Sequence, residues 1–163
     1  MSSPLSLLLQ WLSFFLILCQ IFHASQADLG TASQYSPPYT PSACFGSDST
    51  QFPSSNFFAA ASEGIWDDGA ACGRQYLISC ISSVLPKACK PGETIQIKIV
   101  DRAQNLTSTP TRQGTTMVLS TAALAAIADS NAPSLNIDFR QDKGNDNFNV
   151  TCAHVIGGVS KFS

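Results

Sequence analysis

The sequence has few charged residues and little histidine. Only 12% of its 163 residues are charged, the formal net charge is -2, and the chain holds two histidines, His23 and His154. Nucleic-acid binding needs a cluster of lysine and arginine, so this composition excludes that partner. His23 belongs to the apolar N-terminal region, so His154 is the one histidine outside that region that could act as a catalytic base. This scarcity argues against a catalytic triad and against a histidine-rich zinc site.

Two further kinds of motif are missing. No Cys-x-x-Cys pair occurs, which argues against a cysteine-rich zinc site. No glycine-rich loop leads into Lys-Ser or Lys-Thr, which excludes a phosphate-binding loop. The stretch DKGNDN, residues 142–147, lacks the terminal glutamate and the glycine position of a calcium loop. We therefore expect no metal ion and no cofactor.

The longest apolar run lies at the N-terminus. Residues 5–22 contain no charged side chain, and a run of that length could almost span a bilayer. Small residues in Ser25-Gln26-Ala27 suit cleavage before Asp28, and no cluster of positive charge follows to stop transfer. We predict a secretory signal peptide over residues 1–27, although no Lys or Arg precedes the run. The protein would then be secreted, with no stable membrane insertion after cleavage.

Cleavage would leave five cysteines, and in the oxidising secretory route such thiols usually pair. Two disulfides and one odd thiol are the simplest outcome, and four cysteines alone allow three connectivities. Asn105 and Asn149 each begin an Asn-x-Thr triplet, which is the acceptor pattern for N-glycosylation. The five cysteines are Cys44, Cys72, Cys80, Cys89 and Cys152.

Short strands dominate the pattern after the predicted cleavage site. In Thr94–Arg102, isoleucines alternate with polar residues, which predicts a half-buried strand. Ser120 is a candidate N-cap for an alanine-rich helix over residues 121–129. Residues 56–62 could form a buried strand or one helical turn, and Asp68-Gly69 indicates a turn. Further strands are expected at 30–39, 75–81, 116–119 and 135–141.

This pattern predicts an all-β fold with one short helix, built as a small closed barrel. The barrel domain would span residues 28–141, and we expect the tail, residues 142–163, to be poorly ordered. Glycoside hydrolysis uses two carboxylates across a groove. Asp101 is the most interesting candidate, because an Asp-Arg pair after a strand can form a carboxylate-to-backbone clamp or an active-site acid.

Five motifs, in this order, resemble the plant natriuretic peptide family, small secreted proteins of the expansin-like, family-45-endoglucanase-like group (blight-associated-protein type). They are GTASQYSPPYTPSACFG, FAAASEGIWDDGAACGRQYLISC, IQIKIVDRA, MVLSTAALAAIA and LNIDFRQ, and they cover about residues 30–141. The resemblance implies a six-stranded double-psi β-barrel, similar to domain one of an expansin. No second, carbohydrate-binding domain fits in this sequence.

The resemblance also bears on catalysis. The related hydrolases carry an acid before the helix, and Val118 occupies that place here. Their partner carboxylate follows the tyrosine of the first strand, whereas Tyr35 is followed by Ser36-Pro37-Pro38. Both acids are therefore replaced, which implies that the protein is not an enzyme. Tyr35 and Asp101 could still line a vestigial sugar groove.

The family pattern further suggests the pairings Cys44–Cys72 and Cys80–Cys89. One family bridge is lost near Ala103, and Cys152 is left unpaired beyond the family's usual end. In the family, the segment between the first two cysteines bears the activity. Within it, Trp66 and Phe58 could contact a receptor, since aromatic residues dominate binding hot spots, or could simply fill the barrel core.

The function implied by the resemblance is that of a non-enzymatic, monomeric signalling protein of the apoplast, acting in water and solute homeostasis through a plasma-membrane receptor. The alternative is a wall-loosening or cell-wall polysaccharide-binding module without hydrolase activity. A third hypothesis is a lytic enzyme that uses Asp101.

Overall fold

The computed structural model describes residues 10–11 and 27–142. The rest of the predicted signal peptide, and the tail from residue 143 with Asn149, Cys152 and His154, lie outside the described residues. Within the described part, no helix is long and apolar enough to cross a membrane.

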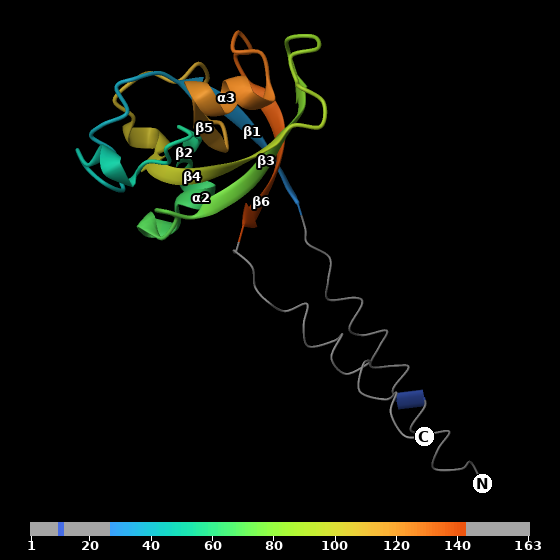
Figure 1. The fold of residues 1–163 in the computed structure, drawn as a ribbon, viewed down its shortest axis with the longest axis horizontal. Coiled ribbons are helices and arrows are strands. Elements are labelled where there is room, and N and C mark those ends of the chain that lie inside the picture. Colours follow the sequence, from blue (N-terminus) through green and yellow to red (C-terminus); the bar gives the residue numbers. More distant parts are fainter. Residues whose placement is uncertain (1–9, 12–26, 143–163) are drawn as a thin grey trace.

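Six strands close into one barrel in the order β1-β5-β2-β4-β3-β6 (Figure 1), which confirms the predicted six-stranded barrel. Strand pairing is mixed: β1 runs parallel to β5 and β2 parallel to β4, while the other neighbours are antiparallel. The strands are β1 (Asp28–Tyr35), β2 (Phe58–Ala61), β3 (Gln75–Ser83), β4 (Thr94–Arg102), β5 (Met117–Ser120) and β6 (Leu135–Asp142).

Short helices fill the connections. Within residues 27–142, the α-helices are α2 (Glu63–Trp66) and α3 (Thr121–Ile127), and the 3-10 helices are η1 (Ser49–Gln51), η2 (Asp67–Gly69) and η3 (Ala103–Asn105). The prediction of a single helix is therefore wrong. Helix α2 is only four residues long, too short to produce a periodic hydrophobic pattern. Its C-terminal neighbours Asp67 and Asp68 have φ of 52° and 49°, so the predicted turn sits in a left-handed kink.

The barrel interior is lined by the isoleucine face of β4. Ile95, Ile97 and Ile99 are buried, while Gln96 between them is exposed, because successive side chains of a strand point to opposite faces. Ile78 of β3 and Ile137 of β6 join the same core. Burial of this alternating face accounts for the confirmed prediction of Thr94–Arg102.

Serine 120 caps α3, as the sequence predicted. Its Oγ accepts a hydrogen bond from the amide of Ala123 at 3.2 Å and donates to the carbonyl of Asn56 at 2.6 Å. The cap therefore also ties the start of α3 to the segment before β2. The helix ends at Ile127, two residues earlier than predicted, because Ala128 is extended and forms an antiparallel bridge with Cys89.

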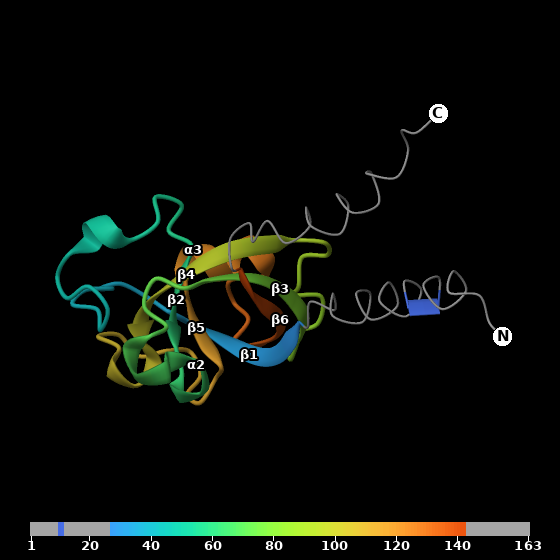
Figure 2. The same cartoon turned by 90° about the horizontal axis from the view of Figure 1, so that it is seen from below.

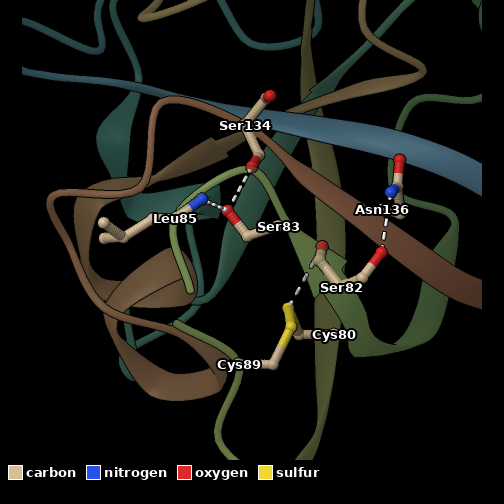
Figure 3. Close-up of a disulfide and its surroundings, with 7 residues drawn as sticks. All are labelled: Cys80, Ser82, Ser83, Leu85, Cys89, Ser134 and Asn136. Atoms are coloured by element: carbon tan, nitrogen blue, oxygen red, sulfur yellow. Dashed lines mark hydrogen bonds between the residues drawn. A yellow bond between two sulfur atoms is a disulfide. The ribbon is translucent and has the colours of Figure 1, made fainter. Parts of the chain in front are cut away.

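The Cys80–Cys89 disulfide staples the connection between β3 and β4 (Figure 3). Beside it, Ser83 Oγ accepts from the amide of Leu85 and donates to the carbonyl of Ser134. Asn136 donates to Ser82 Oγ at 2.7 Å. These contacts hold the connection against the start of β6.

Candidate functional site

Val118, the residue that the resemblance aligns with the hydrolase acid, lies in a closed apolar cluster on the outer side of β1, β5 and β2. Its side chain is 2% exposed and packs with Tyr35, Phe58, Ala60 and Val100. Alternation along β2 explains the position: Ala59 and Ala61 belong to the barrel core, whereas Phe58 and Ala60 point into this second cluster. We call this set of five residues the Val118 cluster.

The connection between β1 and β2 covers the Val118 cluster with aromatic rings. The ring centroid of Tyr39 lies 5.0 Å from that of Tyr35 and 4.8 Å from that of Phe58, and Phe52 lies 4.9 Å from Phe58. These pairs are edge-on, a favourable arrangement for aromatic side chains. Figure 2 shows the part of this connection that carries η1 extending beyond the barrel (teal). The surroundings of Val118 are therefore filled with apolar side chains.

Tyr35 does not line an open groove. Its side chain is 1% exposed, and its hydroxyl has no hydrogen-bond partner among the described residues. Burial raises the pKa of this hydroxyl far above its ordinary value, and the charges of Asp101 and Tyr39 raise the pKa further. The expectation that Tyr35 contacts sugar is not met in this structure, because the aromatic rings above it close the site.

Asp101 is held as a carboxylate-to-backbone clamp, one of the two alternatives that the sequence left open. Its Oδ1 accepts hydrogen bonds from the amides of Ala43 and Arg102, both at 2.8 Å. The side chain is also 1% exposed, so it does not line an open groove either. Burial raises the pKa of Asp101, while the two amides act in the opposite direction.

The two candidate receptor contacts differ in exposure. Phe58 is buried in the Val118 cluster, so its predicted role as a receptor contact does not hold for this structure. Trp66 is half-buried at the end of α2, and the guanidinium of Arg102 lies 5.8 Å from its ring centroid. Arg102 also donates to both oxygens of Glu63, at 2.7 and 2.9 Å, and this bond lowers the pKa of Glu63.

Both disulfides suggested by the resemblance are present. Cys44–Cys72 closes the segment that includes β2, α2 and η2, and Cys80–Cys89 closes the β3–β4 connection. Asn105, the acceptor candidate within the described residues, is exposed at the end of η3. Among residues 27–142, no three His, Cys, Asp or Glu side chains gather in a way that could hold a metal ion.

Comparison with known proteins gives the family. A family model described as lytic transglycolase matches residues 58–139. An EG45-like domain containing protein of Citrus jambhiri is 35% identical over 127 residues, which is 76% of this chain and 88% of the relative. The chain belongs to the EG45-like domain proteins.

Other comparisons agree with this family. EG45-like domain containing protein 2 of Arabidopsis thaliana is 37% identical over 87 residues, or 52% of this chain and 60% of the relative. A mutant Clavibacter michiganensis expansin, solved in complex with cellohexaose, superposes with a TM-score of 0.52 at 20% identity. That match covers 72% of this chain, which spans about half (51%) of the expansin chain. The shared fold is the double-psi β-barrel that the resemblance implied.

This EG45-like protein has one surface feature that the sequence interpretation missed. A depression of about 390 Å³ lies where the segment around η1 meets the start of β3 and the middle of β4. Its polar side chains Gln51, Gln75, Gln96 and Lys98 come from three distant segments. No motif joins these residues in sequence, so only the fold brings them together.

Proposed function

We propose that this EG45-like protein is a secreted, non-catalytic, expansin-like protein of the plant extracellular space. The observation that carries the proposal is the burial of Val118 in an apolar cluster, at the position that the resemblance aligns with the hydrolase acid. Protonation of a leaving oxygen needs a positioned acid. Valine has no proton to give, and Asp101 is engaged in a backbone clamp. The protein would therefore act by binding.

The leading form of this proposal is a natriuretic-peptide-type signal in water and solute homeostasis. The segment between Cys44 and Cys72 supports it, because the disulfide ties the chain just after η2 to the connection between β1 and β2 while most residues of α2 and η2 stay accessible. Trp66, with Arg102 over its ring, is the aromatic side chain in this segment that remains partly exposed at α2. A half-buried tryptophan on a rigid support suits a receptor contact.

The test applies the full chain, purified from the medium of a plant secretory host, to plant protoplasts in isotonic medium. The expected result is a volume change at nanomolar to micromolar doses that is reduced at least fivefold by Trp66→Ala. Leu29→Ala, which removes an exposed apolar side chain from β1, is the matched control. No volume change by the folded wild-type protein, while a family member responds alongside, would remove the signalling form.

The second form is binding of a cell-wall polysaccharide. The observation that favours it is the shared barrel fold with an expansin that was solved in complex with cellohexaose. Sedimentation with cellulose and with pectin tests this form, and retention on either supports it. In the same samples, release of reducing sugar would contradict the non-catalytic proposal and favour a lytic role for Asp101.

A further inference from the structure

The depression beside η1 is separate from the Val118 cluster. Phe52 stands between them: its ring packs on Phe58 at 4.9 Å and also lines the depression. The rest of the wall includes Phe57, Gln75 at the start of β3 and Gln96 on β4. A ligand in this depression would therefore contact the protein without opening the closed cluster that contains Tyr35 and Asp101.

The polar groups of the depression suit a neutral ligand with many hydroxyls. A glutamine amide both donates and accepts hydrogen bonds, and Gln51, Gln75 and Gln96 supply three such amides. Its described lining includes no carboxylate. The one cation, Lys98, is already engaged, because its Nζ donates to the carbonyl of Gln51 at 2.8 Å and lies 5.1 Å from the ring centroid of Phe45.

The apolar part of the lining is already held in place. Phe52 packs on Phe58, and Phe57 packs against the barrel core. Gln96 is fixed by its amide, which donates to Asp142 at 2.5 Å. Aromatic surface beside a few fixed polar groups is the usual composition of a ligand site, and the C–H faces of a hexose fit such a surface. A site whose side chains are ordered before binding loses less entropy on binding.

We infer that this depression binds a neutral, hexose-based wall polysaccharide, with Gln75 and Gln96 as hydrogen-bonding contacts and Phe57 as the apolar surface. The inference rests on the polysaccharide-binding form of the proposed function. It places the sugar beside η1 instead of over Tyr35 and Asp101, and it selects neutral glucans over acidic pectins.

Isothermal titration of the full secreted chain with cellohexaose and with polygalacturonate tests the inference. The variants are Gln75→Ala and Gln96→Ala, and Gln113→Ala is the matched control on an exposed loop. Loss of one to two hydrogen bonds to the ligand should weaken cellohexaose binding by about fivefold to twentyfold in each variant. The control should bind like the wild type, and thermal unfolding of all four proteins checks that they are folded.

The outcomes separate this site from the proposed function. Unchanged cellohexaose affinity in both glutamine variants overturns the site but leaves polysaccharide binding standing. Preference for polygalacturonate overturns the neutral ligand class. If the folded wild-type chain binds none of cellohexaose, cellulose, polygalacturonate and pectin, both the site and the polysaccharide form of the proposed function fail.

Discussion

The carboxylate of Asp101 accepts a hydrogen bond from the backbone amide of Ala43, 58 residues earlier in the chain, at 2.8 Å. The next amide, that of Cys44, donates to the carbonyl of Val100. These two bonds fasten the connection between β1 and β2 to the end of β4. The same connection carries Tyr39 and Phe52, whose rings close the Val118 cluster. Asp101 therefore helps to hold these rings over the cluster.

Replacement of Asp101 should reveal a pH-dependent contribution to stability. Its folded pKa is raised, chiefly by burial, so between the ordinary value of about 3.9 and the folded value the native state binds more protons than the unfolded state. The free energy of unfolding then falls as pH rises through this window and levels off above it. Asp101→Asn keeps an oxygen acceptor but does not titrate. The free energy of unfolding of the wild type minus that of Asp101→Asn should therefore decrease from pH 3 upward.

Urea unfolding of both proteins from pH 3 to pH 7 measures this difference, and other titrating groups cancel in the subtraction. Asp101→Ala removes the acceptor and should cost about 1–3 kcal/mol at pH 7, because the amide of Ala43 loses its partner; this cost should also be larger in acid, since alanine does not titrate either. Asp138→Ala, on the half-exposed outer face of β6, should change stability by at most about 0.5 kcal/mol. If the difference between the wild type and Asp101→Asn instead rises with pH, the two amide hydrogen bonds outweigh burial in setting the pKa of Asp101.

Introducing an acid at position 118 should damage the fold without creating a hydrolase. Val118→Asp places a carboxylate among Tyr35, Phe58 and Val100 with no cation in the cluster as described, and an uncompensated buried charge costs about 3–5 kcal/mol. Val118→Thr, which has nearly the same volume, should cost about 1–3 kcal/mol. Urea unfolding at pH 7 and pH 4 compares the stability of Val118→Asp with that of the wild type. The loss of stability should be smaller at pH 4, because the buried carboxyl becomes neutral. Release of reducing sugar by Val118→Asp would overturn this prediction, because it would show that the cluster can open to a substrate.

Sequence patterns predicted the elements whose signals are local. The isoleucine alternation of Thr94–Arg102 and the capping serine at position 120 each depend on a few adjacent residues. The prediction for strand β2 stayed ambiguous because Phe58–Ala61 is buried on both faces. It therefore lacks the alternation of apolar and polar residues that marks a strand with one solvent-exposed face.

The exposure of the candidate site residues could not be predicted in the same way. Tyr35 and Phe58 are buried because Tyr39 and Phe52 fold back over them, and these rings lie in an aperiodic connection between strands. The resemblance named Tyr35 and Val118 as separate positions, and the structure brings both into the Val118 cluster. The resemblance gave no information about the aromatic rings that close the cluster. Their position depends on long-range contacts such as that between Asp101 and Ala43.

The two disulfides should contribute unequally to stability. Cys44–Cys72 joins residues 28 apart and Cys80–Cys89 joins residues 9 apart. Loop-closure entropy gives about 3.5 kcal/mol for the longer loop and about 2.5 kcal/mol for the shorter one. Urea unfolding of the two double alanine variants measures both losses, and intact mass with and without reduction checks the pairing. A larger loss on removal of Cys80–Cys89 would show that enthalpic contacts around Ser83 outweigh the entropy.

Substitution of Gly30 should be costly, because the side chains of Thr116 and of Phe139 on β6 lie close to its Cα. A Cβ at Gly30 would lie 2.8 Å from Thr116 Oγ1 and 2.9 Å from Cε1 of Phe139. Thr116 cannot easily move, since its Oγ1 accepts from the amide of Thr31 and its own amide donates to Thr31 Oγ1. Gly30→Ala should therefore cost about 1–3 kcal/mol by overpacking.

Gly64 offers the matched control for that substitution. It lies in α2, and no atom comes within 4 Å of a Cβ built there. Gly64→Ala should leave stability unchanged or raise it by at most about 1 kcal/mol, because alanine loses less backbone entropy in a helix. Urea midpoints of the two variants and the wild type make the comparison. Equal midpoints for Gly30→Ala and Gly64→Ala would mean that β1 and β5 can separate without loss, contrary to the reciprocal bonds between Thr31 and Thr116.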